Sequence, residues 1–126
     1  MTHPALPEAT LVETPARLRL LVERLRGEAQ VAVDTESNSL YAYRERVCLI
    51  QISTRHQDYL VDPLVLDDLS LLAPLMANPQ VEKVFHAAEY DIMCLKRDFD
   101  WKFANLFDTH VAARILGWPE VGLASL

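Results

Sequence analysis

Residues 29–36 read Ala-Gln-Val-Ala-Val-Asp-Thr-Glu, and this stretch decides the fold that the sequence predicts. Its first half is nearly all apolar, which is typical of a strand that is covered on both faces of a sheet. Asp34 and Glu36 lie two residues apart at its end. Because side chains alternate along a strand, both carboxylates are expected on the same side. The C-terminal end of such a strand is where ligand sites of α/β sheets form.

The segments around this strand predict an α/β domain. Residues 10–13 fit a short edge strand, and Thr14 and Pro15 fit the N-cap and first position of a helix that ends before Gly27. Further strands are predicted at 47–52, 58–61 and 81–86, and further helices at 71–77 (capped by Ser70), 87–97 and 109–116. Three consecutive strands followed by alternating helices and strands favour a mixed β-sheet flanked by helices.

Length and composition narrow the classes of protein. The 126 residues fit one domain, with residues 1–9 as an N-terminal lead-in and residues 10–126 as the domain itself. The 12 Lys and Arg against 18 Asp and Glu give a formal charge of −6, which argues against a broad basic face for nucleic acid. An enzyme that contacts a few phosphates through bound divalent cations remains compatible with this charge.

The sequence contains no run of about 18 apolar residues, so no membrane-spanning segment is predicted. The first residues lack the basic and apolar regions of a secretory signal. Cys48 and Cys94 both lie in apolar surroundings, which favours two buried thiols in a cytoplasmic protein over a disulfide.

Three carboxylates are candidates for a metal site. Asp34 and Glu36 would repel each other, and a divalent cation would relieve that repulsion; the alternative is a solvated pair at a strand end. Oxygen ligands suit Mg²⁺ or Mn²⁺. Asp91 shares its predicted helix face with Cys94 and Leu95, a poor place for an unpaired carboxylate. A metal shared with Asp34 would explain it, and stabilisation by free N–H groups at the helix start is the alternative.

Several ordered segments carry a family resemblance. Val-Ala-Val-Asp-Thr-Glu-Ser at 31–37 resembles the first exonuclease motif of the DEDD superfamily. Lys-Val-Phe-His-Ala-Ala-Glu-Tyr-Asp at 83–91 resembles the second motif in its ribonuclease D form, and residues 106–117 are similar to the segment that follows in that family. Val-Cys-Leu-Ile-Gln-Ile-Ser at 47–53 and Tyr-Leu-Val-Asp-Pro at 59–63 also fit it.

The resemblance implies a ribonuclease H-like fold and 3′→5′ hydrolysis of phosphodiesters at the single-stranded 3′ end of RNA or DNA. It implies two Mg²⁺ or Mn²⁺ ions in the complete domain. Asp34, Glu36 and Asp91 match three of four metal-binding, catalytic carboxylates, and Glu36 would also hold the terminal 3′-hydroxyl. Leu40 would pack against the last base, while Thr35 and His86 would line the nucleotide pocket.

The sequence departs from the family after Asp91. Residues 92–126 contain neither Tyr-x-x-x-Asp nor His-x-x-x-Asp, the third motif that would supply the last carboxylate. We therefore expect a fragment or truncated gene product that is inactive, or nearly so, alone. The missing closing helix would leave apolar surface uncovered. A second copy of the chain or a partner segment could cover that surface, so a homo-oligomer is one predicted outcome. A non-catalytic module of the same fold, acting through partners or nucleic-acid binding, is the main alternative.

Other polar residues have simpler interpretations. Asp62, before Pro63, is expected to start a turn rather than to be a fourth ligand, and Asp108 is expected to be a helix N-cap. The four histidines show no zinc-ligand spacing with each other or with the cysteines. A phosphoacceptor receiver domain is disfavoured because Lys83 begins its strand instead of ending one.

Overall fold

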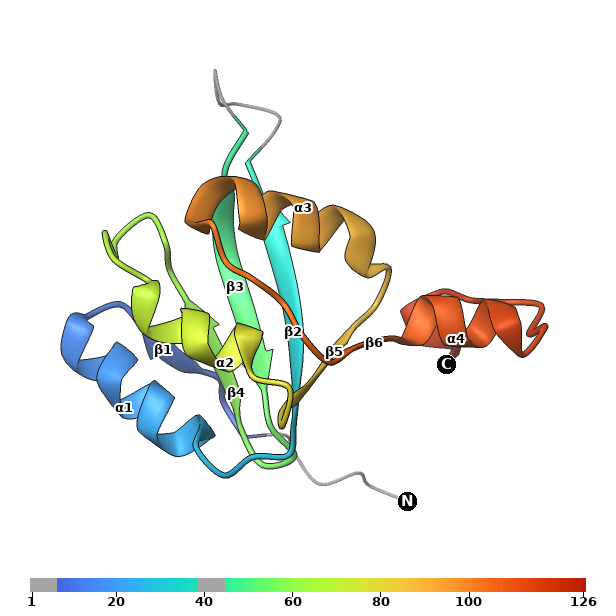
Figure 1. Cartoon of the computed structure of the whole chain (residues 1–126), viewed down its shortest axis with the longest axis horizontal. Coiled ribbons are helices and arrows are strands. Elements are labelled where there is room, and N and C mark those ends of the chain that lie inside the picture. The colour runs from blue at the N-terminus through green and yellow to red at the C-terminus, as the bar shows by residue number, and fades with distance from the viewer. Residues whose placement is uncertain (1–6, 39–44) are drawn as a thin grey trace.

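The computed structural model describes residues 7–38 and 45–126. Strands and short helices follow each other closely in this part of the chain (Figure 1). Their bounds are β1 Thr10–Val12, α1 Pro15–Leu25, β2 Gln30–Ser37, β3 Val47–Ser53, β4 Asp58–Val61, a 3₁₀ turn Ser70–Leu72, α2 Ala73–Ala77, β5 Glu82–Phe85, α3 Ala88–Phe99, β6 Leu106–Asp108, α4 Thr109–Ile115 and a 3₁₀ turn Leu123–Ser125.

The described strands form one mixed, six-stranded sheet in the order β1-β4-β3-β2-β5-β6. β2, β3 and β4 are antiparallel neighbours, whereas β1 runs parallel to β4, β5 parallel to β2, and β6 parallel to β5. The predicted α/β fold with a mixed sheet is thereby confirmed. This topology brings β2, near the start of the chain, beside β5, so that the helix following β5 lies next to the strand that carries Asp34 and Glu36.

Helix α1 forms where the sequence predicts it. The hydroxyl of Thr14 accepts a hydrogen bond from the backbone N–H of Arg17 at 3.2 Å, and Pro15 occupies the first helical position. Gly27, just beyond the helix, has φ of +85°, a conformation that glycine adopts without strain. The buried residues Leu18, Leu21 and Leu25 form one stripe at helical spacing and hold α1 against the sheet.

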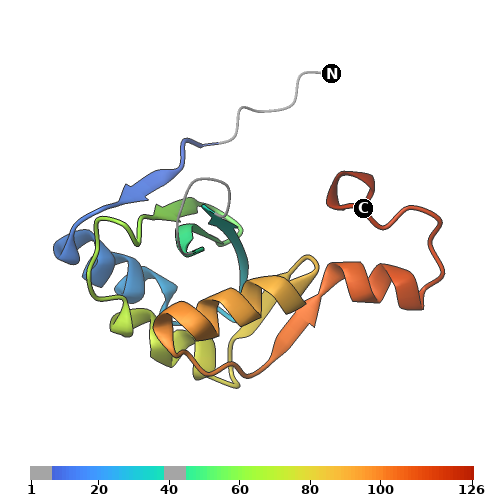
Figure 2. The same cartoon turned by 90° about the horizontal axis from the view of Figure 1, so that it is seen from above.

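Helices α1, α2 and α3 lie on the same side of the sheet (Figure 2). On that covered side β2 buries Val31 and Val33, while Ala32, Asp34 and Glu36 on the opposite side are exposed. The expectation that this strand is covered on both faces is therefore wrong for the described chain. Because Ala32 is apolar but exposed, the sequence looks continuously apolar although buried and exposed residues alternate along the strand. The exposed face of the strand carries the acidic pair.

Lys83 is a buried charge within the core. Its side chain is fully buried on the covered side of β5. The Nζ group donates to the carbonyl oxygens of Asn78 at 2.8 Å and Val81 at 2.6 Å. Burial lowers the pKa of Lys83 below its usual value, because a charged ammonium loses hydration there. These contacts indicate a structural role for Lys83 in the core, on the side of the sheet opposite the open face.

Two local features differ from the sequence-based prediction. The backbone N–H of Ser70 bonds to the carboxylate of Asp68 at 2.8 Å, so residues 70–72 form a 3₁₀ turn and Ser70 does not cap a helix. Strand β6, only three residues long, was not predicted. Its pairing with β5 supplies hydrogen bonds that a three-residue sequence pattern does not reveal.

Helix α4 extends away from the sheet (Figure 1). Exposed apolar side chains gather along it and just beyond it, namely Val111, Ile115, Leu116, Trp118 and Leu123. None of the helices built from residues 7–38 and 45–126 has the length and apolar character needed to cross a membrane. Cys48 and Cys94, in β3 and α3, are both free thiols.

Candidate metal-binding site

Asp34 and Glu36 project from the C-terminal half of β2 onto the open face. Both side chains are exposed, and the intervening Thr35 is half-buried on the other side. Asp34 lies opposite Gln51 of β3, in the interior of the sheet rather than at its edge. A register irregularity follows between Glu36 and Ser37, and such bulges re-aim side chains near functional sites. The predicted same-side placement of the two carboxylates is present.

Thr35 reaches in the opposite direction and contacts the helix above it. Its hydroxyl donates a hydrogen bond to Oδ1 of Asp91 at 2.7 Å. The two residues are far apart in sequence and meet because β5, which leads into α3, is the parallel neighbour of β2. This bond ties the helix-borne carboxylate to the strand that carries the other two.

Asp91 lies in the first turn of α3 on its buried face, together with Ala88, Cys94 and Leu95. Only 9% of the residue is exposed, as expected from its helical position. Burial raises the pKa of Asp91; the hydrogen bond from Thr35 opposes this shift, and the negative charges of Asp34 and Asp108 add to it. The charge of Asp34 on β2 thus contributes to the raised pKa of Asp91 on α3.

Asp108 caps two helices at once. Its carboxylate accepts hydrogen bonds from the N–H groups of His110 and Val111 at the start of α4, at 2.9 and 3.3 Å. It also accepts from Ala87 and Ala88 at the start of α3, at 2.9 and 2.7 Å. The predicted N-cap is confirmed, and the second cap, on α3, was missed because nothing local to residue 108 signals it. The second cap fixes the helix start from which Asp91 projects.

His86 lies close to Asp34 on the open face. Its Nδ1 is 2.8 Å from the hydroxyl of Thr109, which donates to the carbonyl oxygen of Phe85, and its ring meets His110 edge-on at 5.3 Å. A hollow of about 460 Å³ contains His86 and Asp34 together with Gln51, Ser53, Thr109 and Leu123 in its lining. Thr35 is absent from that lining, and Leu40 falls outside the residues that the structure describes.

The donor chemistry at this site suits a hard divalent cation. The candidate ligands offer carboxylate oxygens only. A cation would neutralise the charge of Asp34 and stabilise the ionised form of buried Asp91. Within residues 7–38 and 45–126, however, no three His, Cys, Asp or Glu side chains converge closely enough to hold an ion together. Asp34 and Glu36 share a face, and Asp91 approaches from the helix side.

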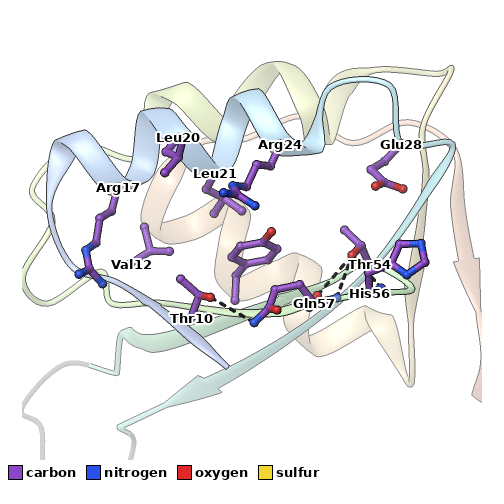
Figure 3. A pocket seen from close by; sticks show the side chains of 11 residues that line it. Thr10, Val12, Arg17, Leu20, Leu21, Arg24, Glu28, Thr54, His56 and Gln57 are labelled. Carbon is purple, nitrogen blue, oxygen red and sulfur yellow. Dashed lines mark hydrogen bonds between the residues drawn. The ribbon is translucent and has the colours of Figure 1, made fainter. Parts of the chain in front are cut away.

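A larger hollow lies elsewhere, at the N-terminal side of the fold. It has a volume of about 650 Å³ between α1 and the β3–β4 turn, as Figure 3 shows. Arg17 and Arg24 face it from α1, and Thr54, His56 and Gln57 face it from the turn. The guanidinium of Arg17 donates to the carbonyl of Leu11 at 3.0 Å, so it joins α1 to β1. None of the three candidate carboxylates lines this hollow.

Two further acids have structural roles, and the sequence predicts that of Asp62. Oδ1 of Asp62 accepts from the backbone N–H of Leu64 at 2.9 Å, which confirms a turn after β4. Asp98, near the end of α3, accepts from the backbone N–H of Val47 at 2.7 Å and anchors that helix over the start of β3.

A mixed sheet with Asp-x-Glu on an interior strand, and a third, buried carboxylate on the helix that packs against it, defines the 3′→5′ exonuclease class of α/β domains. A family model described as 3'-5' exonuclease matches residues 9–126, and the chain belongs to this family. Within it, the chain is a ribonuclease D-like exonuclease domain of the DEDD type.

Relatives and solved structures agree with this assignment. The chain is 42% identical over 116 residues to exosome complex exonuclease RRP6 of Saccharomyces cerevisiae, covering 91% of this chain and 16% of the relative. It is 39% identical over 118 residues to the exosome complex component 10 homolog of Caenorhabditis elegans, covering 93% and 14%. It therefore spans about one seventh of the length of these relatives.

Among solved structures, the catalytic core of RRP6 from Trypanosoma brucei superposes with a TM-score of 0.89 at 41% identity, over 95% of this chain and 33% of that one. Escherichia coli RNase D superposes with a TM-score of 0.86 at 29% identity, over 94% and 32%. The fold is thus the RNase D/RRP6 exonuclease fold, and the chain covers about a third of these solved chains.

Proposed function

We propose that this chain contributes the acidic, metal-binding part of an exonuclease domain that trims RNA from its 3′ end. The observation that carries the proposal is the pair Asp34 and Glu36 on the open face of β2, with buried Asp91 hydrogen-bonded to the intervening Thr35. Support for RNA comes from relatives: the yeast protein is an exosome complex exonuclease, and the Escherichia coli enzyme is an exoribonuclease involved in structured RNA processing.

In the proposed site, Asp34, Glu36 and Asp91 hold divalent cations, Mg²⁺ or Mn²⁺. Two such ions, when bound, supply an activated water and stabilise the leaving 3′-oxygen. The protein contributes rigid placement: Asp34 and Glu36 are fixed by the interior strand, and Asp91 by a helix capped at its start by Asp108. Glu36 would also accept a hydrogen bond from the terminal 3′-hydroxyl of the substrate, and its carboxylate is exposed on the open side.

Substrate contacts follow from the same face. His86, beside Asp34 in the lining of the hollow of about 460 Å³, would line the pocket of the terminal nucleotide. Leu40, which lies outside the described residues, would pack against the last base as the family resemblance implies. Metal ions would carry the contact with phosphate, because the chain has a formal charge of −6 and no basic surplus to do so. Recognition by stacking and backbone contacts would make trimming tolerant of sequence.

We also propose that the 126-residue chain alone is inactive or nearly so. Residues 92–126 offer no Tyr-x-x-x-Asp or His-x-x-x-Asp that could supply a fourth carboxylate and a water-orienting side chain. The test is trimming of a labelled single-stranded RNA by the isolated chain in Mn²⁺. Robust metal-dependent trimming would show the inactivity proposal to be wrong, and a matched DNA oligonucleotide in the same assay compares the two substrates.

Mn²⁺ titration by calorimetry tests the metal site independently of activity. We expect Asp34→Asn to weaken Mn²⁺ binding at least about tenfold, a loss comparable to that of a well-placed metal-site partner. Asp67→Asn is the matched control, because Asp67 is an exposed acid in the loop after β4. Equal Mn²⁺ affinity in both variants would reject the proposed site and favour a non-catalytic module of the same fold.

The exposed apolar residues on and beyond α4 support a further proposal. Val111, Ile115, Leu116, Trp118 and Leu123 form a surface that we call the α4 patch. Several exposed apolar residues on one segment favour an interaction site there. We propose that a second copy of the chain covers the α4 patch in solution, giving a homo-oligomer.

A further inference from the structure

We propose that Thr35 is a positioning residue that sets the orientation of the Asp91 carboxylate toward the metal site. The inference rests on the proposed function of Asp91 as a metal ligand. It assigns to Thr35 a role distinct from the lining of a nucleotide pocket. The side chain of Thr35 touches Asp91 on the covered side of the sheet, and it does not line the hollow that Asp34 and His86 share.

The first step is directional. Strand alternation sends Asp34 and Glu36 to the open face and sends Thr35 toward α3. The Thr35 hydroxyl therefore meets Asp91 from β2, at 2.7 Å from Oδ1. Among the described residues, no hydrogen bond reaches Oδ2 of Asp91, so one carboxylate oxygen is held by Thr35 and the other has no hydrogen-bond partner there.

The second step concerns what is already fixed without Thr35. Helix α3 is anchored at its start by the Asp108 carboxylate and near its end by the bond from the Val47 N–H to Asp98. These anchors place the backbone of Asp91 but leave its side-chain torsions free. Among the described residues, the Thr35 hydroxyl donates the hydrogen bond to that carboxylate, so it favours one rotamer of the Asp91 side chain.

The third step is energetic. A hydroxyl that donates to a carboxylate at this distance makes a charge-assisted hydrogen bond, which is among the stronger kinds. Hydrogen-bonding partners behind a metal ligand commonly change metal affinity by about 10–100-fold.

The experiment uses the 126-residue chain and two substitutions. Thr35→Val removes the hydroxyl while keeping the size and the β-branch, and Thr35→Ser keeps the hydroxyl while removing the methyl. We expect Thr35→Val to weaken Mn²⁺ binding about tenfold and Thr35→Ser to bind within about threefold of the wild type. A purely structural role would not follow the hydroxyl in this way. Wild-type affinity in Thr35→Val, with folding checked by circular dichroism, overturns the inference.

A second measurement separates this inference from the proposed function. If the wild type binds no Mn²⁺, the proposed metal site is rejected. The contact between Thr35 and Asp91 is then tested by unfolding the protein without metal. Urea unfolding of Thr35→Val, Asp91→Ala and the double variant forms a double-mutant cycle. Non-additive midpoints support a Thr35 hydroxyl that holds Asp91, whereas additive midpoints overturn it. Thr54→Val, in the turn that follows β3, is the control hydroxyl deletion.

Discussion

At the scale of single residues, Lys83 and Asp91 are two buried ionisable groups that differ in how the protein compensates the lost hydration of their charges. Lys83 is fully buried and satisfies its ammonium with the carbonyls of Asn78 and Val81. Asp91 is almost buried and receives one hydrogen bond from Thr35. Lys83 is thus satisfied within the protein. Among residues 7–38 and 45–126, Oδ2 of Asp91 has no hydrogen-bond partner, and Asp34 is a negative neighbour whose charge a cation would offset.

Lys83 leads to a prediction about stability and pH. Its pKa in the folded protein lies below the ordinary value of 10.5 because of burial. Between those two values the unfolded chain binds more protons, so the contribution of Lys83 to stability rises with pH through this window. The Lys83→Met variant should lack this rise. Urea unfolding at several pH values checks it, with Lys96→Met, on the exposed side of α3, as the control for removal of a positive charge. Parallel profiles for the wild type and Lys83→Met would contradict the prediction.

Gln51 and Ser53 of β3 show what sequence reasoning could and could not find at this scale. The acidic pair was visible because its spacing alone dictates a shared side. The neighbours of Asp34 in the hollow, including Gln51 and Ser53, depend on the register between β2 and β3. That register is set by pairing across the chain, so no local pattern announces it. The role of Thr35 was hidden for the same reason.

At the scale of elements, α3 and α4 are joined by one carboxylate. Asp108 gives each helix the N-terminal acceptor that its free N–H groups require. Ala87, which precedes α3, has φ of +57°, a left-handed conformation that costs energy for a residue other than glycine. The hydrogen bond from its N–H to Asp108 holds this turn in place, so α3 begins where Asp91 can meet Thr35.

We predict that Asp108→Ala destabilises the fold by about 2–3 kcal/mol, more than the typical loss of about 1 kcal/mol for one cap. Asp108→Asn should cost less, because Oδ1 alone accepts from Ala87, His110 and Val111. Thr14→Ala, which removes the single cap of α1, provides the scale within the same protein. Chemical denaturation measures all three, and equal losses in Asp108→Ala and Thr14→Ala would refute the double cap.

The same carboxylate predicts an acid dependence. Burial tends to raise the pKa of Asp108, but hydrogen bonds from four backbone N–H groups outweigh it and lower the pKa below 3.8. The stabilisation is therefore complete above pH 3.8 and is lost as pH falls through the lower folded-state pKa. The stability difference between the wild type and Asp108→Asn should shrink in that acid range. A difference independent of pH would show that Asp108 is not held ionised by these caps.

The elements also show which signals in the sequence were sufficient. Helix α1 was predictable because its cap, its proline and its leucine stripe are all local. Strand β6 was not, because three residues acquire strand geometry only by pairing with β5. The open face of β2 was mispredicted because apolar content is not burial: Ala32 lies on the exposed side. The family resemblance, by contrast, rests on motif order, which survives such local errors.

At the scale of the whole molecule, the described chain is asymmetric. Helices α1–α3 cover one face of the sheet, and the other face carries the acidic pair and remains open (Figure 2). Helix α4 projects from the side of the sheet (Figure 1), and the α4 patch lies on it and on the residues that follow it. Leu123 of the α4 patch also lines the hollow that Asp34 and His86 share, whereas Ile115 is separate from that lining, so a change at Ile115 should leave the acidic site measurable.

This separation makes self-association through the α4 patch testable by a single charge. Ile115 is 79% exposed in α4, so Ile115→Asp should place a carboxylate in the proposed interface without disturbing the core. Leu20→Asp is the matched control, because Leu20 is 54% exposed on α1, away from the α4 patch. We expect the sedimentation coefficient of the wild type and Leu20→Asp to rise with concentration, while Ile115→Asp stays monomeric. Because Ile115 lies outside the acidic site, Mn²⁺ affinity should be unchanged in Ile115→Asp. A wild type that remains monomeric at its solubility limit would reject the second copy as the partner of the α4 patch.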